Sequence, residues 1–170
     1  MVSHEAADVF VYDALSNAAI RKLLFDRKVE SRQVYVEDYQ LGMAGNSDLT
    51  LLRGKGITVG EVFRLYPEEE IDLVKKFMNR SRKQSVTYEL VPLEVNLSNP
   101  DNNRAPSVAI EVLTPIITAT TVPIEGLDPK GYGFIRGRDM RPVFKAARMV
   151  RAQYLANSIP PSLEVLATSL

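Results

Sequence analysis

The stretch Val9-Phe10-Val11-Tyr12-Asp13-Ala14-Leu15-Ser16 decides the fold. Its first four residues favour a β-strand, and the period of two places Val9 and Val11 on one face and Phe10 and Tyr12 on the other. Because both faces are apolar, we expect a central strand over about 8–14 that is buried on both sides. At Asp13 the pattern breaks, and a helical pattern follows over about 17–27.

The turn between this strand and this helix is a candidate ligand site. The first amide N–H groups of a helix have no intrahelical partner and point outward, so such turns often hold anions. The alternative is an ordinary connection in which Ser16 or Asn17 caps the helix. The pattern alone leaves both interpretations open.

Composition narrows the classes of function. The chain has 170 residues, 45% apolar and 25% charged, which is typical of one globular domain with a substantial core. Lys plus Arg and Asp plus Glu both number 21, and this zero net charge argues against nucleic-acid binding by the whole surface. With no cysteine and with His4 as the single histidine, we expect no disulfide, no metal site and no Ser-His-Asp triad. We also expect no cofactor.

Two features of the sequence bear on location. No apolar run approaches the length that spans a membrane, and the first residues lack the apolar stretch of a signal peptide. We therefore expect a cytoplasmic protein without a membrane partner.

Several further strands follow the first helix. Alternation and β-branched residues predict strands over about 29–43, 49–52, 57–65, 85–97 and 107–113, the last ending at Pro115. Gly60, within one of them, indicates a bulge or a close approach to the backbone. Pro92 favours an edge position or a bulge. A helix starts at Pro67, and the glutamates of its first turn favour the helix dipole rather than catalysis.

The C-terminal part, 116–170, is predicted to be an extension to a domain over 1–115. It contains an amphipathic helix over about 139–157 with one apolar stripe. A basic stripe follows a separate face and consists of Arg141, Lys145 and Arg148, with Arg151 adjacent. This stripe is either a solvated helix face or a contact surface for an acidic partner or RNA.

The order of elements favours an α+β fold, with a mixed, partly closed β-sheet or barrel, a few flanking helices and a C-terminal helix. Four segments within about 8–113 carry a resemblance to a known family: Val9–Leu15, Val59–Glu70, Val74–Asn79 and Tyr88–Val95. The family is the gamma-glutamylcyclotransferase-like superfamily. In the same order, the segments resemble its Tyr-Gly loop after the first strand, its Gly-containing strand before an acid-rich helix start, its Leu-Asp-x-Tyr/Phe-Glu-Gly helix end and its Tyr-Arg-Arg-Val-x-Val-x-Val strand.

The resemblance implies a cyclisation in which the substrate α-amine attacks its own γ-amide carbonyl and releases 5-oxoproline. It also implies that N–H groups of the loop bind the γ-glutamyl carboxylate, and that a Glu at the helix end takes and returns the proton. The residues that it implies for substrate binding are Tyr12, Asp13, Ala14, Leu15, Gly60 and Tyr88.

This sequence departs from the family pattern at two places. Met78 stands where the family has its catalytic Glu, and a thioether transfers no proton; loss of a general base costs about 10²–10⁴ in rate. Asp13 stands at the loop glycine, where a carboxylate repels an anionic substrate and a Cβ hinders close approach. No acidic residue lies between Asp72 and Glu89 to replace the lost Glu.

Three hypotheses follow. The first is a non-catalytic member of this fold that binds a γ-glutamyl-like small molecule, a protein partner or a second copy through the C-terminal extension. The second is an active or altered cyclotransferase in which Asp13 serves as a relocated acid/base. The third is an RNA-associated protein that uses the basic stripe, against which the zero net charge argues.

Overall fold

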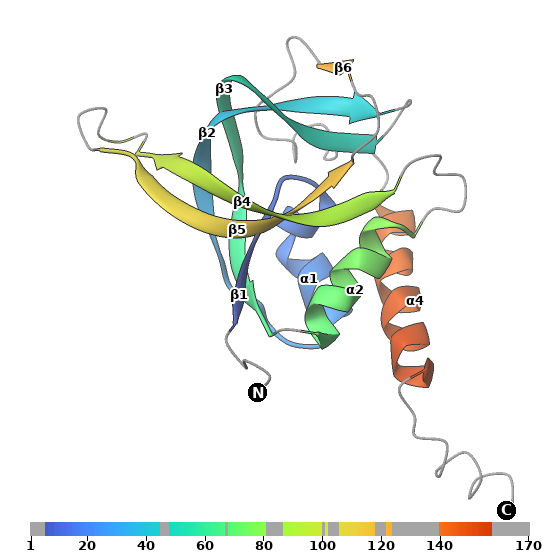
Figure 1. Cartoon of the computed structure of the whole chain (residues 1–170). Coiled ribbons are helices and arrows are strands. Elements are labelled where there is room, and N and C mark those ends of the chain that lie inside the picture. Colours follow the sequence, from blue (N-terminus) through green and yellow to red (C-terminus); the bar gives the residue numbers. More distant parts are fainter. Residues whose placement is uncertain are drawn as a thin grey trace, which may run out of the picture.

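A computed structural model describes the parts of the chain that carry the fold. Within them, strands curve around a common interior and the α-helices gather on one side (Figure 1). The described residues are 6–44, 48–66, 68–80, 87–99, 101, 106–117, 122–123 and 140–157.

The elements follow one another in mixed order. The strands are β1 (Ala7–Val11), β2 (Ser31–Ala44), β3 (Asp48–Leu65), β4 (Tyr88–Ser98), β5 (Val108–Ile117) and β6 (Val122–Pro123). The helices are the short 3-10 helix η1 (Ala14–Ser16) and the α-helices α1 (Ala18–Phe25), α2 (Glu69–Met78) and α4 (Arg141–Asn157).

Five strands close into a mixed barrel. They pair in the order β3-β1-β5-β4-β2, and an extra pairing of β2 with β3 closes the circle, while β6 adds to β2 outside it. The β1–β5 pair is parallel and the other pairs are antiparallel. The predicted α+β class, with a mixed barrel, flanking helices and a C-terminal helix, is confirmed.

The two faces of the first strand contact two different cores. Val9 and Val11 belong to the cluster between the barrel and the helices, whereas Phe10 and the following Tyr12 belong to the cluster inside the barrel. All four are at most 1% exposed, which confirms the expected two-sided burial. The strand ends earlier than predicted, because the chain turns at Asp13, whose carbonyl accepts the Ser16 N–H at 2.9 Å.

The helix α4 covers the same core from outside. Ala147 and Val150 are buried in the cluster that α1 and α2 also fill, and Val143 and Tyr154 pack against it. The apolar stripe predicted for 139–157 is therefore the packing face of this helix. In Figure 1, α4 lies alongside α2, and α1 completes the helical side.

Two strand boundaries differ from the expectation. The segments 49–52 and 57–65 form one continuous strand, β3, because long β2 pairs with it on both sides of a register shift between Glu37 and Tyr39. Asp38, at that shift, has a left-handed φ of 64°. The other difference is β5, which does not stop at Pro115 but continues to Ile117, because its partner β4 runs opposite it as far as Tyr88.

Pro92 lies where β4 has one paired side. It faces Leu113 of β5, and β4 pairs with β2 only at Leu97 and Ser98. A residue without an N–H is tolerated there, since no second neighbour needs that donor. The edge interpretation of Pro92 is correct.

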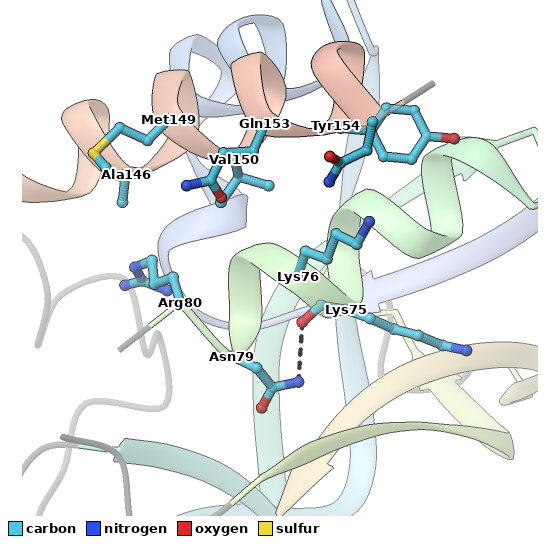
Figure 2. Close-up of a pocket in the computed structure, with 10 residues that line it drawn as sticks. Lys75, Lys76, Asn79, Arg80, Ala146, Met149, Val150, Gln153 and Tyr154 are labelled. Carbon is cyan, nitrogen blue, oxygen red and sulfur yellow. Dashed lines mark hydrogen bonds between the residues drawn. The ribbon is translucent and has the colours of Figure 1, made fainter. Parts of the chain in front are cut away.

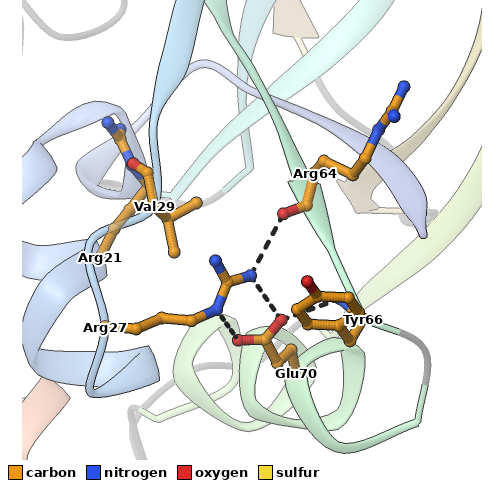
Figure 3. Close-up of polar contacts among 6 residues, drawn as sticks. All are labelled: Arg21, Arg27, Val29, Arg64, Tyr66 and Glu70. Atoms are coloured by element: carbon orange, nitrogen blue, oxygen red, sulfur yellow. Dashed lines mark hydrogen bonds and ion pairs between the residues drawn. The ribbon is translucent and has the colours of Figure 1, made fainter.

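Glu70, in the first turn of α2, holds three elements together (Figure 3). Its two oxygens accept hydrogen bonds from Nε and Nη2 of Arg27, both at 2.7 Å, and Oε1 also accepts the N–H of Tyr66 at 2.8 Å. Arg27 Nη2 further donates to the carbonyl of Arg64 at 3.3 Å. The structural role predicted for the first-turn glutamates is thus evident in Glu70.

Candidate functional site

The loop between β1 and α1 binds its own carboxylate. Asp13 lies before η1, 8% exposed, and its Oδ1 accepts the N–H of Leu15 at 3.3 Å. The next two amides, those of Ser16 and Asn17, donate to the carbonyls of Asp13 and Ala14 at 2.9 and 3.1 Å. The N–H groups of Leu15, Ser16 and Asn17 are therefore engaged within the loop.

Two opposing influences act on the Asp13 carboxyl. Burial raises its pKa, because removal from water disfavours the charged form. The guanidinium of Arg80, beyond the end of α2, and the Leu15 N–H both act to lower that pKa. The net result is a raised pKa, which is common at functional sites and also at structural buried carboxyls.

Tyr12 and Tyr88 use their hydroxyls inside the fold. The Tyr12 hydroxyl donates to the carbonyl of Pro115 at 2.5 Å, and the Tyr88 hydroxyl donates to that of Leu49 at 2.5 Å. Burial, followed by the neighbouring Tyr88 and Asp13, raises the pKa of Tyr12 well above its ordinary value. Both hydroxyls therefore connect segments that lie far apart in the sequence.

Asn79 fixes Tyr88 against the end of α2, a role the sequence did not reveal. Its Nδ2 donates to the carbonyls of Lys75 and Tyr88 at 2.9 and 3.1 Å, and its Oδ1 accepts the Tyr88 N–H at 2.8 Å. This amide satisfies a late carbonyl of the helix and also pairs with both backbone groups of Tyr88. An Asn directly after a predicted helix was the available signal.

The close approach to the backbone that was predicted at Gly60 is made by residues of β1, not by a ligand. A Cβ on Gly60 would lie 2.3 Å from the carbonyl oxygen of Val11 and 2.5 Å from the ring of Phe10. Gly60 pairs in regular register with Val34, so no bulge occurs there. The space above this glycine is thus filled by β1.

Met78, at the last position of α2, lies in the apolar core. Its side chain belongs to the cluster between barrel and helices and is 3% exposed. The polar groups near the end of this helix are instead Asn79 and Arg80. Arg80 donates from Nη1 to the carbonyl of Phe77 at 3.0 Å, and its guanidinium lies over the Phe77 ring.

A buried arginine positions the loop from behind. Arg21 is 3% exposed and donates from Nη1 to the carbonyl of Leu15 at 2.9 Å, from Nη2 to Ser31 Oγ at 2.8 Å and from Nε to the carbonyl of Val29 at 3.3 Å. Burial lowers its pKa, and Glu61 partly offsets this. Sequence reasoning missed Arg21, because an arginine in a helix is normally expected at the surface.

The basic stripe of α4 faces away from these residues. Arg141, Lys145 and Arg148 are exposed, whereas Arg151 is half-buried, and its buried Nε has no hydrogen-bond partner within the part of the chain that the structure describes. The structure thus brings the first three together on one open helix face.

A groove of about 630 Å³ separates α2 from α4 (Figure 2). None of the stripe residues lines it. Its wall on the α2 side carries Lys75, Lys76, Asn79 and Arg80, and its wall on the α4 side carries Ala146, Met149, Val150, Gln153, Tyr154 and Asn157. Sequence reasoning missed this surface because it requires two helices that lie about seventy positions apart in the chain.

The described residues offer no metal cluster and no membrane-spanning helix. Among these residues, no three His, Asp or Glu side chains come together as ligands for a metal ion. None of the helices within the described ranges combines the length and apolar character needed to cross a bilayer.

The chain is similar in structure to several solved proteins. An Arabidopsis thaliana protein known from a solution structure is 18% identical, with a TM-score of 0.49, 94% of this chain and 97% of that chain covered. A gamma-glutamyl cyclotransferase is 15% identical, with a TM-score of 0.45 and coverage of 71% and 73%. A yeast gamma-glutamyl cyclotransferase specific to glutathione is 14% identical, with a TM-score of 0.44 and coverage of 88% and 96%.

No family model and no curated protein matches the sequence of this chain. At 18% identity or less, the structural likenesses concern the course of the backbone and carry nothing about activity. The resemblance inferred from the sequence thus has its counterpart among solved structures, as a distant likeness to gamma-glutamyl cyclotransferases.

Proposed function

We propose that this chain is a non-catalytic binding protein on a fold of the gamma-glutamylcyclotransferase type. The burial of Met78 carries this proposal. The resemblance places the proton-transferring Glu at this position, and here a thioether that cannot accept a proton packs into the apolar core at 3% exposure.

The loop supports the same conclusion independently. The Asp13 carboxylate accepts the Leu15 N–H, which the resemblance assigns to the carboxylate of a substrate. A γ-glutamyl substrate would need to displace this internal carboxylate and would meet its charge at short range. Two features therefore oppose the family reaction. Met78 removes the base, and Asp13 occupies an N–H group that would bind the substrate carboxylate.

The direct test is 5-oxoproline release from γ-glutamyl dipeptides, glutathione and γ-glutamyl-lysine. We expect no release by the wild-type chain above the rate without protein. Turnover by the wild type that Asp13→Asn abolishes would refute the proposal and establish the alternative below.

One observation favours that alternative, an altered cyclotransferase. Asp13 is a buried carboxyl with a raised pKa, and a proton-transferring group is often tuned in this way. Against it stands the hydrogen bond from the Leu15 N–H, which stabilises the charged form but also fixes the carboxylate toward its own backbone. A γ-glutamyl-like molecule remains the candidate small ligand of this loop, and isothermal titration with non-hydrolysable γ-glutamyl analogues tests it.

The protein-partner part of the proposal involves α4 and the extension from 116 onward. Removing the extension is a poor test, because Ala147 and Val150 of α4 are part of the core. A surface substitution in the basic stripe, such as Lys145→Glu, is a better test of partner binding than a deletion. Light scattering detects whether a homodimer forms. We further propose that the chain consists of a domain over 1–115 and an extension over 116–170. We also propose that the protein is cytoplasmic.

The RNA reading of the stripe has its own test. A phosphate-dominated complex weakens steeply as salt rises to the physiological range. Binding that does not respond to salt would exclude that mode.

A further inference from the structure

We propose that the groove between α2 and α4 is the docking site for an acidic helical segment of a partner protein. This rests on the binding role above and names its surface and its partner chemistry. The charge, the length and the apolar floor of the groove favour this occupant (Figure 2).

The charge of the groove is one-sided. Lys75, Lys76 and Arg80 line it, and none of the described lining residues is Asp or Glu. Lys76 already pairs with Asp72 at 3.1 Å. Within the described part of the chain, Lys75 and Arg80 have no carboxylate within ion-pair distance. Arg80 donates to the Phe77 carbonyl and acts on the Asp13 carboxyl, but both side chains are exposed, so both can contact an acidic ligand.

Lysines near a helix C-terminus also have a structural reason. They interact favourably with the helix dipole, by about 0.3–1 kcal/mol each. This accounts for Lys75 and Lys76 in the last turn of α2, and Arg80, which lies beyond the helix, donates to the late carbonyl of Phe77 at 3.0 Å. The helix end does not account for the exposed methionine of the opposite wall.

The floor and far wall supply apolar contacts. Met149 is 51% exposed on the α4 wall, and Val150 and Tyr154 lie deeper. An unbranched, polarisable methionine adapts to varied partners and is frequent on surfaces that bind helices. The groove therefore offers both a charge contact and an apolar contact to the same occupant.

The shape of the groove favours a helix over a small molecule. Lining residues of α4 extend from Ala146 to Asn157, and eleven steps of 1.5 Å correspond to about 16 Å, or three turns. The side chains of Lys75, Arg80 and Met149 are exposed, so the groove is an open channel and not an enclosed cavity. Two packed helices present a channel into which the apolar face of a third helix fits.

Charges of both signs lie near Tyr154, at one end of the groove. Burial, followed by Glu69 and Asp72, raises the Tyr154 pKa, whereas Lys76 and Arg151 act to lower it. The cations that line the groove are all on the α2 wall. The acidic residues of the partner segment should therefore contact that wall.

The same features argue against RNA. A single-stranded nucleic acid needs several free aromatic faces for its bases, and the described groove offers Tyr154, whose ring already has Lys76 5.0 Å from its centre. A valine and a methionine match apolar side chains better than bases. The groove therefore fits a protein segment better than RNA, and the test below distinguishes the two.

The experiment selects twelve-residue peptides from a random display library on the full chain and measures the affinity of the enriched peptides. Matched variants carry the same change of charge: Lys75→Glu/Arg80→Glu in the groove and Lys145→Glu/Arg148→Glu in the stripe. Met149→Glu is a second groove variant, chosen because an exposed side chain can change without loss of folding. Circular dichroism checks that each variant is folded, and a uridine dodecamer is the RNA probe.

We expect enriched peptides with at least two acidic residues and apolar residues three or four positions apart. Both groove variants should weaken their binding about tenfold or more, and the stripe variant less than about twofold. The proposal is overturned if no acidic peptide is enriched, if only the stripe variant weakens binding, or if the groove variants weaken the uridine dodecamer alone. Parallel 5-oxoproline assays separate the two proposals, since turnover refutes the non-catalytic role without affecting a peptide contact in the groove.

Discussion

Met78→Glu tests the central inference most directly. If position 78 lies in a working active site, a glutamate there should be tolerated and should add acid/base chemistry. If it lies in the core, as its 3% exposure indicates, the new carboxyl must be buried among apolar side chains. The two interpretations predict opposite signs for stability and activity.

The expected loss can be worked from the burial. Replacing a fully buried methionine removes about 1.5–3 kcal/mol of apolar transfer free energy. Burying a carboxyl without a partner costs about 1–3 kcal/mol more even when it is neutral. We therefore expect the free energy of unfolding to fall by about 2.5–6 kcal/mol, a large part of the 5–15 kcal/mol typical of a domain.

Urea unfolding followed by far-ultraviolet circular dichroism measures this loss, because the chain has no tryptophan. The control is Met78→Leu, which conserves volume and should cost less than about 1.5 kcal/mol. Since burial disfavours the charged carboxylate, the loss in Met78→Glu should also be greater at pH 8 than at pH 5. A stable variant that releases 5-oxoproline would refute the placement of this residue in the core.

Three further substitutions test the surrounding structure. Gly60→Ala should destabilise by about 3 kcal/mol in urea, because its Cβ would lie 2.3 Å from a backbone oxygen that cannot move freely, and an unchanged midpoint would contradict this packing. In Asp13→Asn the unfolding free energy relative to wild type should rise as pH increases from about 3 to 7. The reason is that burial raises the Asp13 pKa in the folded chain, so wild type loses stability as this carboxyl ionises. If the variant instead lost stability relative to wild type as pH increased, the raised pKa of Asp13 would be excluded. Glu70→Gln should cost about 1–2 kcal/mol through the Arg27 contacts in the same assay, and no loss would mean that water replaces them.

Much of the local structure was predictable because it depends on neighbours in the sequence. The alternation over Val9–Tyr12 indicated burial of both faces, and the stripe through Ala147 and Val150 indicated the packing face of the last helix. Acids after Pro67 indicated a helix start, and Glu70 fulfils a structural role there. These signals depend on residues close together in the sequence, because side chains repeat with a fixed period along one strand or one helix.

The continuity of β3 and the extension of β5 were not predictable from the same patterns. Glycines at Gly54 and Gly56 and the proline at Pro115 read locally as breaks. Pairing with long β2 and with β4 overrides them, since a ladder of hydrogen bonds to a neighbouring strand outweighs a weak local preference.

The candidate site shows the same division. The sequence by itself determined that position 78 has no proton-transferring group and that a carboxylate occupies the loop after the first strand. Only the tertiary structure decided that Met78 is buried, that Asp13 takes the Leu15 N–H and that Arg80 acts on it. The physical reason is that the functional group of a residue is fixed by its identity alone. Its burial, the electric field on it and the groove between α2 and α4 arise from distant segments that only folding brings together.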